Sequence, residues 1–347
     1  MATLITGGAG FIGGHTVLAF LDRGEVPIVL DDLSTGSREA VPSGVPFVIG
    51  DVGDTELVSH LIRDYKIDAI VHFAAKIIVP ESVADPLKYY FNNTVKTHAL
   101  LKTAVDENLK HFVFSSSAAV YGNPSSTPVS ETALPAPLSP YGMSKLMSEY
   151  MLADVSAASK LRHVTLRYFN VAGADPAGRL GQSTPGATHL IKVAIETALR
   201  RRPSMSIYGD DYPTPDGTCI RDYVHVSDLA QAHLVALDHL RNGGASRTLN
   251  CGYGRGYSVK EVVRAVKMIT GVDFEARQAA RRAGDPASIV ADSDQLLSLG
   301  WKPKLNDLPK MIEHACNWER RLMTSVATAR RGQASTAVNV GHAPALP

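Results

Sequence analysis

Residues 2–13 read Ala-Thr-Leu-Ile-Thr-Gly-Gly-Ala-Gly-Phe-Ile-Gly, an apolar run followed at once by a glycine-rich turn. The run predicts a short β-strand, and the residues from the turn to about Arg23 have the pattern of a helix. Glycines at positions 7, 10 and 13 give the spacing G-x-x-G-x-x-G, which lets a backbone turn tightly and approach a pyrophosphate at a helix N-terminus. A glycine cluster alone is often only a turn, so the residues that follow decide its meaning.

Two aspartates follow the next predicted strand. Residues 27–30 read Pro-Ile-Val-Leu and end in Asp31 and Asp32, where a carboxylate suits the 2′-hydroxyl of a cofactor ribose. The same carboxylate would repel a 2′-phosphate. The sequence therefore predicts a dinucleotide site that takes NAD rather than NADP.

Strands and helices continue to alternate through the first half of the chain. Further strands are predicted at 45–49, 69–75, 111–115 and 164–170, separated by helices at about 54–65, at 85–109 and around Tyr141. Such alternation predicts the α/β class with a doubly wound, Rossmann-like parallel sheet. His72 lies inside one of these apolar strands, so we expect a hydrogen-bonded core histidine there rather than a ligand or a base.

The pattern changes after residue 175. The later elements are short and mixed, with helices predicted at 188–200, 227–240, 258–270 and 307–322 and strands at 204–208 and 247–250. We expect an NAD-binding Rossmann-like domain at 1–175 and a smaller mixed α/β substrate-binding lobe at 176–322, partly interleaved with the first. The remainder, residues 323–347, is expected to be a flexible tail.

A serine-rich segment and a tyrosine–lysine pair follow the predicted strand at 111–115. Residues 115–122 read Ser-Ser-Ser-Ala-Ala-Val-Tyr-Gly, and residues 141–145 read Tyr-Gly-Met-Ser-Lys. Residues four apart on a helix are neighbours, so the Lys145 ammonium could approach the Tyr141 phenol and favour the phenolate. The pair alone is a weak signal, because such spacing usually marks a solvated face. Its position after a strand end, where parallel sheets bind ligands, predicts a base assisted by a hydrogen bond from Ser117.

The composition is that of an ordinary globular protein. The chain has 347 residues, enough for one large or two closely joined domains, and its 35 basic and 34 acidic residues give a net charge of +1. No basic run stands out, which argues against a nucleic-acid partner. The 3 cysteines are widely spaced, so neither a disulfide framework nor a metal site is indicated, and a reducing cytoplasm fits best. No apolar stretch reaches the length of a membrane span, and no leader is apparent.

Several motifs together resemble one family. They are the glycine turn, His-Phe-Ala-Ala at 72–75, residues 115–122, the Tyr141 and Lys145 pair, Leu-Arg-Tyr-Phe-Asn at 166–170 and Arg-Asp-Tyr-Val-His-Val at 221–226. The chain resembles the extended short-chain dehydrogenase/reductases, and within them the UDP-sugar 4-epimerases, over about residues 2–320. The later motifs are much more specific than the glycine turn.

The resemblance implies a tightly held NAD that is reduced and reoxidised within each turnover of a UDP-hexose, interconverting UDP-glucose and UDP-galactose. Tyr141, kept deprotonated by Lys145 and the nicotinamide charge, would take the proton of the sugar 4-hydroxyl while a hydride leaves C4. The resulting 4-keto sugar would rotate and take the hydride back on its other face. Ser117 would hold the reacting oxygen. Family habit also implies a homodimer formed through a two-helix face.

The family's binding residues can be carried over by position. Cofactor contacts fall at Gly7, Gly10, Phe11, Ile12, Gly13, Asp31, Asp32, Asp51, Val52, Phe73, Ala74, Ala75, Asn93, Ser115, Tyr141, Lys145 and Phe169. Contacts to the nucleotide sugar fall at Ser117, Asn170, His189, Leu190, Ser206, Tyr208, Arg221, Arg282 and Asp285. Guanidinium groups suit diphosphate oxygens and a carboxylate suits a ribose diol. Outside this pattern an isolated Arg or Asp is more often a surface charge.

Four positions depart from the family pattern. Ile77 stands where many epimerases have a cofactor-binding lysine, so the role of the neighbouring Lys76 stays open. Gly14 replaces a common serine, and His189 replaces the asparagine of some members. Ile289 occupies the position that admits or excludes an N-acetyl group, and its intermediate size leaves that specificity open.

Other functions remain as alternatives. A UDP-pentose, UDP-N-acetylhexosamine or UDP-hexuronate 4-epimerase would differ only in the loosely held sugar. A nucleotide-sugar 4,6-dehydratase carries an Asp-Glu pair where this chain has Ala118 and Ala119, and methyl groups perform no acid–base chemistry. A non-catalytic NAD-binding protein usually lacks the tyrosine or the lysine, and both are present here.

Overall fold

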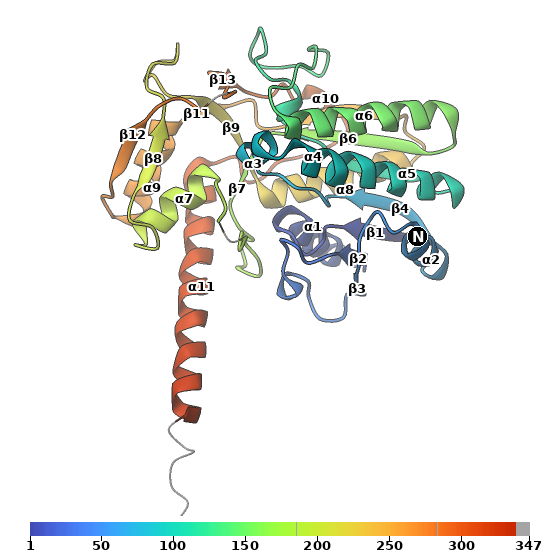
Figure 1. Cartoon of the computed structure of the whole chain (residues 1–347), viewed down its shortest axis with the longest axis horizontal. Helices are drawn as coiled ribbons and strands as arrows, with labels where there is room; N and C mark the ends of the chain where they lie inside the picture. The colour runs from blue at the N-terminus through green and yellow to red at the C-terminus, as the bar shows by residue number, and fades with distance from the viewer. Residues whose placement is uncertain (185, 283, 338–347) are drawn as a thin grey trace, which may run out of the picture.

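A seven-stranded parallel sheet forms the larger part of the molecule (Figure 1). The computed structural model describes residues 1–184, 186–282 and 284–337. The strand order is β10-β6-β5-β4-β1-β2-β3, formed by β1 (Ala2–Thr6), β2 (Ile28–Asp31), β3 (Phe47–Ile49), β4 (Ile67–His72), β5 (His111–Ser115), β6 (Arg162–Tyr168) and β10 (Arg247–Cys251). The order runs outward from β1 in both directions, so the predicted doubly wound sheet is confirmed.

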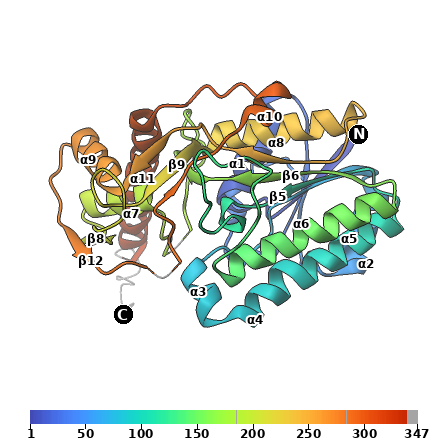
Figure 2. The same ribbon diagram turned by 90° about the horizontal axis from the view of Figure 1, so that it is seen from above.

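Helices cover both faces of this sheet. Helix α1 (Phe11–Asp22) packs against α8 (Val226–Arg241) on one face. The other face is covered by α2 (Thr55–Asp64), α5 (Lys96–Asp106) and α6 (Pro140–Ala158), and Figure 2 shows α5 and α6 running side by side. Side chains alternate between the two faces of a strand, so Ile5 joins the α1–α8 core and Leu4 joins the opposite one.

A smaller mixed lobe lies beside the ends of these strands (Figure 1). Strand β9 (Ile220–His225) pairs with three short strands, β7 (Asn170–Ala172), β11 (Gly256–Ser258) and β13 (Ser288–Ile289). Strands β8 (Met205–Tyr208) and β12 (Ala276–Ala279) form a separate pair. The helices α7 (Leu190–Ala198), α9 (Val259–Thr270) and α11 (Leu308–Ala337) build a core of their own.

The chain returns from this lobe to the large sheet. Helix α8 and strand β10 both follow β9 in sequence, yet α8 packs on α1 and β10 pairs with β6, with Leu249 opposite Leu166. The short helix α10 (Asp294–Ser298) also contacts β10. The boundary predicted near residue 175 therefore separates the two parts only incompletely, as the expected interleaving implies.

The helix predicted at 85–109 is broken into several pieces. It comprises α4 (Pro86–Tyr89), a π-helical segment η2 (Tyr90–Val95) and α5, and it is preceded by α3 (Val79–Ala84). A π-helical turn accommodates an extra residue and is frequent at functional sites. Asn93, one of the predicted cofactor residues, lies within this segment.

The remaining elements are short or terminal. Two 3₁₀ turns, η1 (Arg38–Ala40) and η3 (Ala118–Val120), follow β2 and β5. Helix α11, predicted to end near residue 322, continues to Ala337 and so runs through part of the predicted tail, while residues 338–347 lie outside the described residues. None of the described helices combines the length and the apolar character that a membrane-spanning helix needs.

Candidate active site

The glycine turn lies against the end of β4. Gly7 has a φ of +70°, and a Cβ atom there would lie 2.6 Å from the amide nitrogen of Ala74. A Cβ atom on Gly13 would lie 2.2 Å from the carbonyl oxygen of Gly7. Helix α1 begins directly after Gly10 without a side-chain cap, so its first N–H groups lack partners within the helix. The turn is shaped as a cradle that an anionic diphosphate fits.

Asp31 braces this turn from the end of β2. Its Oδ2 atom accepts a hydrogen bond of 2.9 Å from the Ala9 amide, and its Oδ1 atom accepts one of 2.8 Å from the Leu33 amide. Burial raises the pKa of this carboxyl. Asp32 is exposed, and its Oδ1 atom accepts from the Ser34 amide at 2.9 Å. The two carboxylates therefore differ, one supporting the turn and the other facing outward.

The edge of the predicted cofactor groove carries two lysines. Lys76 donates a hydrogen bond of 3.1 Å from Nζ to Ser34 Oγ, which brings it from the end of β4 to the loop after β2. Lys96 forms an ion pair with Asp51, whose other carboxylate oxygen accepts from the Gly53 amide at 2.8 Å. Together with the glycine turn and Asp31, these groups fit a dinucleotide, because they offer a backbone cradle for its diphosphate and carboxylates for its riboses.

Tyr141 lies in the first turn of α6. The helix begins with Pro140, and its N-cap Ser139 accepts a hydrogen bond from the Gly142 amide at 3.2 Å, a cap that fixes where the helix starts. The phenol is buried. Burial raises the pKa of Tyr141, and a hydrogen bond with the Ser117 side chain opposes that rise.

Lys145 follows one turn later on the same helix. Its Nζ atom donates a hydrogen bond of 2.7 Å to the carbonyl oxygen of Ser115 and lies 5.0 Å from the Phe114 ring centroid. Burial lowers the pKa of Lys145 to about 7, against the opposing charge of Glu149. The i,i+4 spacing predicted an ammonium that lowers the pKa of Tyr141. In the structure, burial of the phenol has the larger effect, and the pKa of Tyr141 is raised instead.

Ser115 is held from the opposite face of the sheet. Its Oγ atom lies 2.8 Å from His233 Nε2 on α8, and His233 Nδ1 lies 2.9 Å from the Leu229 carbonyl oxygen. A carbonyl only accepts, so Nδ1 carries the proton and Nε2 accepts from the Ser115 hydroxyl. The ring of Phe73, another predicted cofactor residue, lies 4.6 Å from the His233 ring.

Asn93 joins the end of β4 to α6. Its Oδ1 atom accepts from the Lys76 amide at 2.8 Å, and its Nδ2 atom donates to the Lys76 carbonyl at 2.9 Å and to Ser144 Oγ at 3.0 Å. The side chain thus spans from residue 76 to the helix that carries Tyr141. Nearby, His72 is confirmed as a core histidine, because its ring bonds Thr6 and Thr97 and burial lowers its pKa to about 3.

Apart from Ser117, the residues predicted to bind the nucleotide sugar fall into three groups. The Arg282 guanidinium stacks 3.8 Å from the Tyr208 ring, and Arg221 Nη2 lies 3.5 Å from Asp285 Oδ1. Ser206 lies on the same strand as Tyr208. The third group, Asn170, His189 and Leu190, lines a cavity between β7, α7 and α11.

One buried hydrophobic cluster joins the segment after β5 to β13. Phe169, a predicted cofactor contact, packs in it with Ala118 of η3 and with Ile289 of β13. Ile289 is the position that the family uses to admit or exclude an N-acetyl group. Val52, the neighbour of Asp51, is buried in the core beneath α2 and α5.

Sequence reasoning missed several polar residues that support the site. Gln182, Lys192 and Glu319 line the same cavity as His189. His233 is hydrogen-bonded to Ser115. The charge of Glu149 raises the pKa of Lys145 against the effect of burial. The nearest sequence signal is the helical spacing of Lys145 and Glu149. The other pairs join residues far apart in the chain and carry no local pattern.

Known proteins resemble this chain over nearly its whole length. The model of the NAD dependent epimerase/dehydratase family matches residues 3–252. A UDP-glucose 4-epimerase of Azospirillum brasilense is 55% identical over 94% of this chain and 94% of its own length. The solved UDP-glucose 4-epimerase of Brucella ovis, in complex with NAD, has a TM-score of 0.88 at 44% identity, covering 91% of this chain and 97% of that one.

A third relative is named for two sugars. The UDP-Glc/GlcNAc 4-epimerase of Campylobacter jejuni has a TM-score of 0.81 at 49% identity, covering 92% of this chain and 99% of that one. The fold of this chain agrees with these matches. The chain belongs to the NAD dependent epimerase/dehydratase family.

Proposed function

We propose that the protein catalyses the NAD-dependent, reversible 4-epimerisation of a UDP-hexose, interconverting UDP-glucose and UDP-galactose. The observation that carries this proposal is the presence in one fold of a buried Tyr141, whose pKa the Ser117 side chain lowers against the effect of burial, and of a glycine turn suited to a diphosphate. The similarity to UDP-glucose 4-epimerases supports the choice of sugar nucleotide.

The chemistry needs one base and one hydride acceptor. Tyr141 removes the proton of the sugar 4-hydroxyl, and Ser117 holds the reacting oxygen. NAD, which the glycine turn would hold, would supply the hydride acceptor for the first step and the hydride donor for the second. C4 becomes a carbonyl when the proton and the hydride leave. Return of the hydride to the other face of C4, and of the proton to its oxygen, gives the epimer, so the sugar undergoes no net oxidation.

The two lobes divide the binding. We assign the cofactor to the glycine turn and strand ends of residues 1–175. We assign the nucleotide sugar mainly to residues 176–322, with Ser117 and Asn170 contributed by the first part. Arg221 and Arg282 would bind the diphosphate and Asp285 a ribose diol. Tight binding of the UDP part leaves the hexose free to rotate between the two hydride transfers. Epimerisation requires this rotation.

The exact sugar is the least constrained part of this assignment. Ile289 is aliphatic and packs beside Phe169, so it neither fills the site as an aromatic ring would nor opens it as a small residue would. UDP-N-acetylhexosamines, UDP-pentoses and UDP-hexuronates are therefore the alternatives. Ala118 and Ala119 supply no acid or base, which disfavours a 4,6-dehydratase.

Product analysis without added cofactor tests the proposal. The purified protein is incubated separately with UDP-galactose, UDP-N-acetylgalactosamine and UDP-xylose, and the epimers are separated by chromatography. We expect UDP-glucose to form from UDP-galactose fastest. An unchanged UDP-galactose pool beside rapid pentose turnover would replace the hexose assignment, and no turnover of any of the three would favour a non-catalytic NAD-binding protein.

We further propose that two copies associate through the face formed by η2 and α6. Leu87, Phe91 and Val95 follow one another at helical spacing and are 76%, 60% and 51% exposed. Met147 and Tyr150 on α6, which packs against η2, are 38% and 58% exposed. Adjacent helices with exposed apolar side chains suit a symmetric contact between identical copies.

We also propose a cytoplasmic location. Cys219, Cys251 and Cys316 are all buried free thiols, as expected of a protein that works in a reducing compartment. A nucleotide-sugar substrate and an NAD cofactor fit the same compartment.

A further inference from the structure

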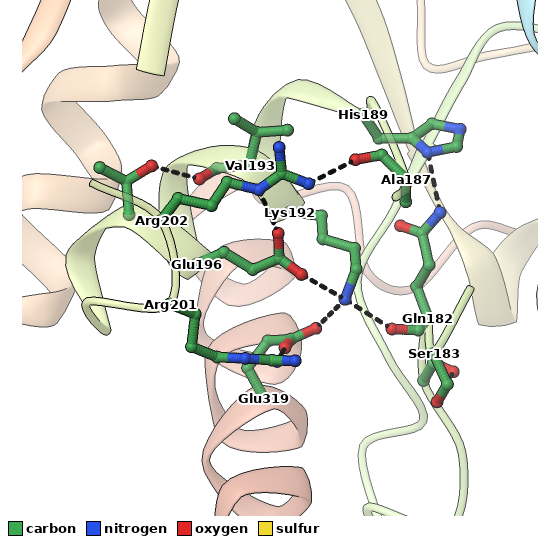
Figure 3. Close-up of polar contacts among 12 residues, drawn as sticks. Gln182, Ser183, Ala187, His189, Lys192, Val193, Glu196, Arg201, Arg202 and Glu319 are labelled. Carbon is green, nitrogen blue, oxygen red and sulfur yellow. Dashed lines mark hydrogen bonds and ion pairs between the residues drawn. The ribbon is translucent and has the colours of Figure 1, made fainter. Parts of the chain in front are cut away.

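An ionic cluster lies beneath the loop that leads to His189 (Figure 3). We call it the Lys192 cluster; it comprises Lys192, Glu196, Arg201, Arg202 and Glu319. Lys192 Nζ lies 3.2 Å from Glu196 Oε1 and is also paired with Glu319 of α11. Arg201 pairs with Glu319, and Arg202 pairs with Glu196 at 2.5 Å. Lys192, Glu196 and Glu319 are buried.

Two cations of the cluster hold the loop itself. Lys192 Nζ donates a hydrogen bond of 3.0 Å to the carbonyl oxygen of Gln182, and Arg202 Nη2 donates one of 3.1 Å to the carbonyl oxygen of Ala187 (Figure 3). These bonds lie near the two ends of the segment between Gln182 and His189. The cluster therefore anchors the backbone at Gln182 and at Ala187, the second of which lies two residues before His189.

The side chain of Gln182 continues this contact to His189. Its Nε2 atom lies 2.8 Å from His189 Nδ1, and an amide nitrogen can only donate. The neutral ring must then accept at Nδ1 and carry its proton on Nε2. Among the residues that the structure describes, Nε2 makes no hydrogen bond. His189, Asn170 and Lys192 line the same cavity.

The charges of this region favour an anion in the cavity. The Lys192 cluster holds three cations and two carboxylates, so its net charge is positive. Burial lowers the pKa of His189, and the nearby Lys192 charge lowers it further. The histidine is thus a neutral, oriented donor beside a positively charged cluster, an arrangement that suits the oxygens of a diphosphate.

We propose that Lys192 is a positioning residue for substrate binding: through Gln182 it fixes His189 so that Nε2–H donates a hydrogen bond to the diphosphate of the nucleotide sugar. This inference rests on the proposed function. It gives helix α11, whose Glu319 lines the same cavity, a part in holding Lys192 in place.

Binding of UDP, measured by calorimetry on the NAD-loaded protein, tests the proposal. Gln182→Met removes the amide donor but leaves the Lys192 cluster intact, and Lys192→Met removes the ammonium that holds the loop. We expect both to weaken UDP binding by roughly tenfold to a hundredfold, the value of a hydrogen bond to a charged group. The KM for UDP-galactose should rise by a similar factor while kcat changes by less than about threefold, because Tyr141 and Ser117 are untouched.

Two further variants provide the comparison. Lys192→Arg keeps a cation and should retain most of the UDP affinity. Lys267→Met removes a lysine of α9 that is paired with Asp273 at 2.5 Å in the same lobe, and it should bind UDP as the unchanged protein does.

The outcomes separate this inference from the assigned activity. Unchanged UDP affinity in Gln182→Met would overturn the positioning role even if Lys192→Met fails to fold. A fall in kcat at constant KM in either variant would also overturn it, because the damage would then lie at the reacting centre. If the unchanged protein binds no UDP at all, the proposed function itself fails.

Discussion

The ammonium group of Lys145 lies 2.7 Å from the carbonyl oxygen of Ser115. This contact ties α6, which carries Tyr141, to the end of β5. The Ser115 hydroxyl is bonded in turn to His233 of α8 at 2.8 Å, and α8 covers the other face of the sheet. The position of the proposed base is therefore fixed from both layers of helices, which favours a preorganised site.

Tyr141→Phe should abolish epimerisation while leaving the fold intact. The variant lacks only the hydroxyl that takes the proton, so a fall in kcat of roughly a hundredfold to ten-thousandfold is expected. NAD content, measured by absorbance after release, should stay at the level of the unchanged protein. Tyr65→Phe, at a tyrosine that is 41% exposed, serves as the control, and substantial turnover by Tyr141→Phe would assign the base elsewhere.

Gly13→Ala should remove bound NAD. Its Cβ atom would lie 2.2 Å from the Gly7 carbonyl oxygen, so the backbone of the diphosphate cradle must shift, at a cost of about 1–3 kcal/mol. Gly14→Ser is the matched control, because its Cβ atom would meet mainly the flexible end of Leu180. We expect little NAD in purified Gly13→Ala and ordinary NAD in Gly14→Ser; equal NAD contents would contradict the assigned cradle.

Phe91→Glu should convert the proposed dimer into monomers. The change removes an apolar contact worth roughly 1.5–3 kcal/mol per copy. It also places a charge on a face that the second copy would cover in the dimer. Sedimentation equilibrium would measure the oligomeric state. Leu134→Glu, at a residue 86% exposed in the loop before α6, should leave it unchanged, and a dimeric Phe91→Glu would exclude the η2–α6 face as the interface.

His163→Leu should make the protein less sensitive to mild acid. Burial lowers the pKa of His163 to about 4, and its Nδ1 atom has no hydrogen-bond partner among the described residues. The unfolded chain therefore binds the proton more readily than the folded one, so this histidine lowers the free energy of unfolding as pH falls from about 6.5 towards 4. At pH 5 the free energy of unfolding is lower by about 2 kcal/mol because of this histidine.

Denaturant titrations at pH 7 and pH 5 measure that effect. The unchanged protein should lose about 2 kcal/mol more than His163→Leu between the two pH values. His98→Leu replaces an exposed histidine of α5 and should follow the unchanged protein. If His163→Leu loses stability to the same extent, the burial of a neutral ring does not govern the acid response.

The sequence predicted those features of the fold that short residue patterns encode. Alternating apolar strands and amphipathic helices gave the doubly wound sheet, and the glycine turn and the tyrosine of α6 lie at its strand ends as expected. The capping box of Ser258 and Glu261 likewise marks the start of α9, close to the predicted residue. Each of these signals spans only a few residues, so it can be recognised in one sequence without a structure.

The support of the site depends on pairs that no local pattern reveals. Ser115 and His233 are 118 residues apart, and Lys192 and Glu319 are 127 apart. The π-helical turn that carries Asn93 depends on contacts with Ser144 and with the backbone of Lys76. The hydrogen bond from Lys145 to the Ser115 carbonyl likewise joins residues 30 apart in the chain, and only the folded chain shows it.

The return of α8 and β10 to the large sheet limits how this protein can evolve. A recombination that exchanged everything after residue 175 with a distant relative would also exchange an edge strand and a covering helix, whose side chains must match those of β6 and α1. New sugar preferences would therefore arise by individual replacements around the pocket, with the two lobes inherited together as one unit.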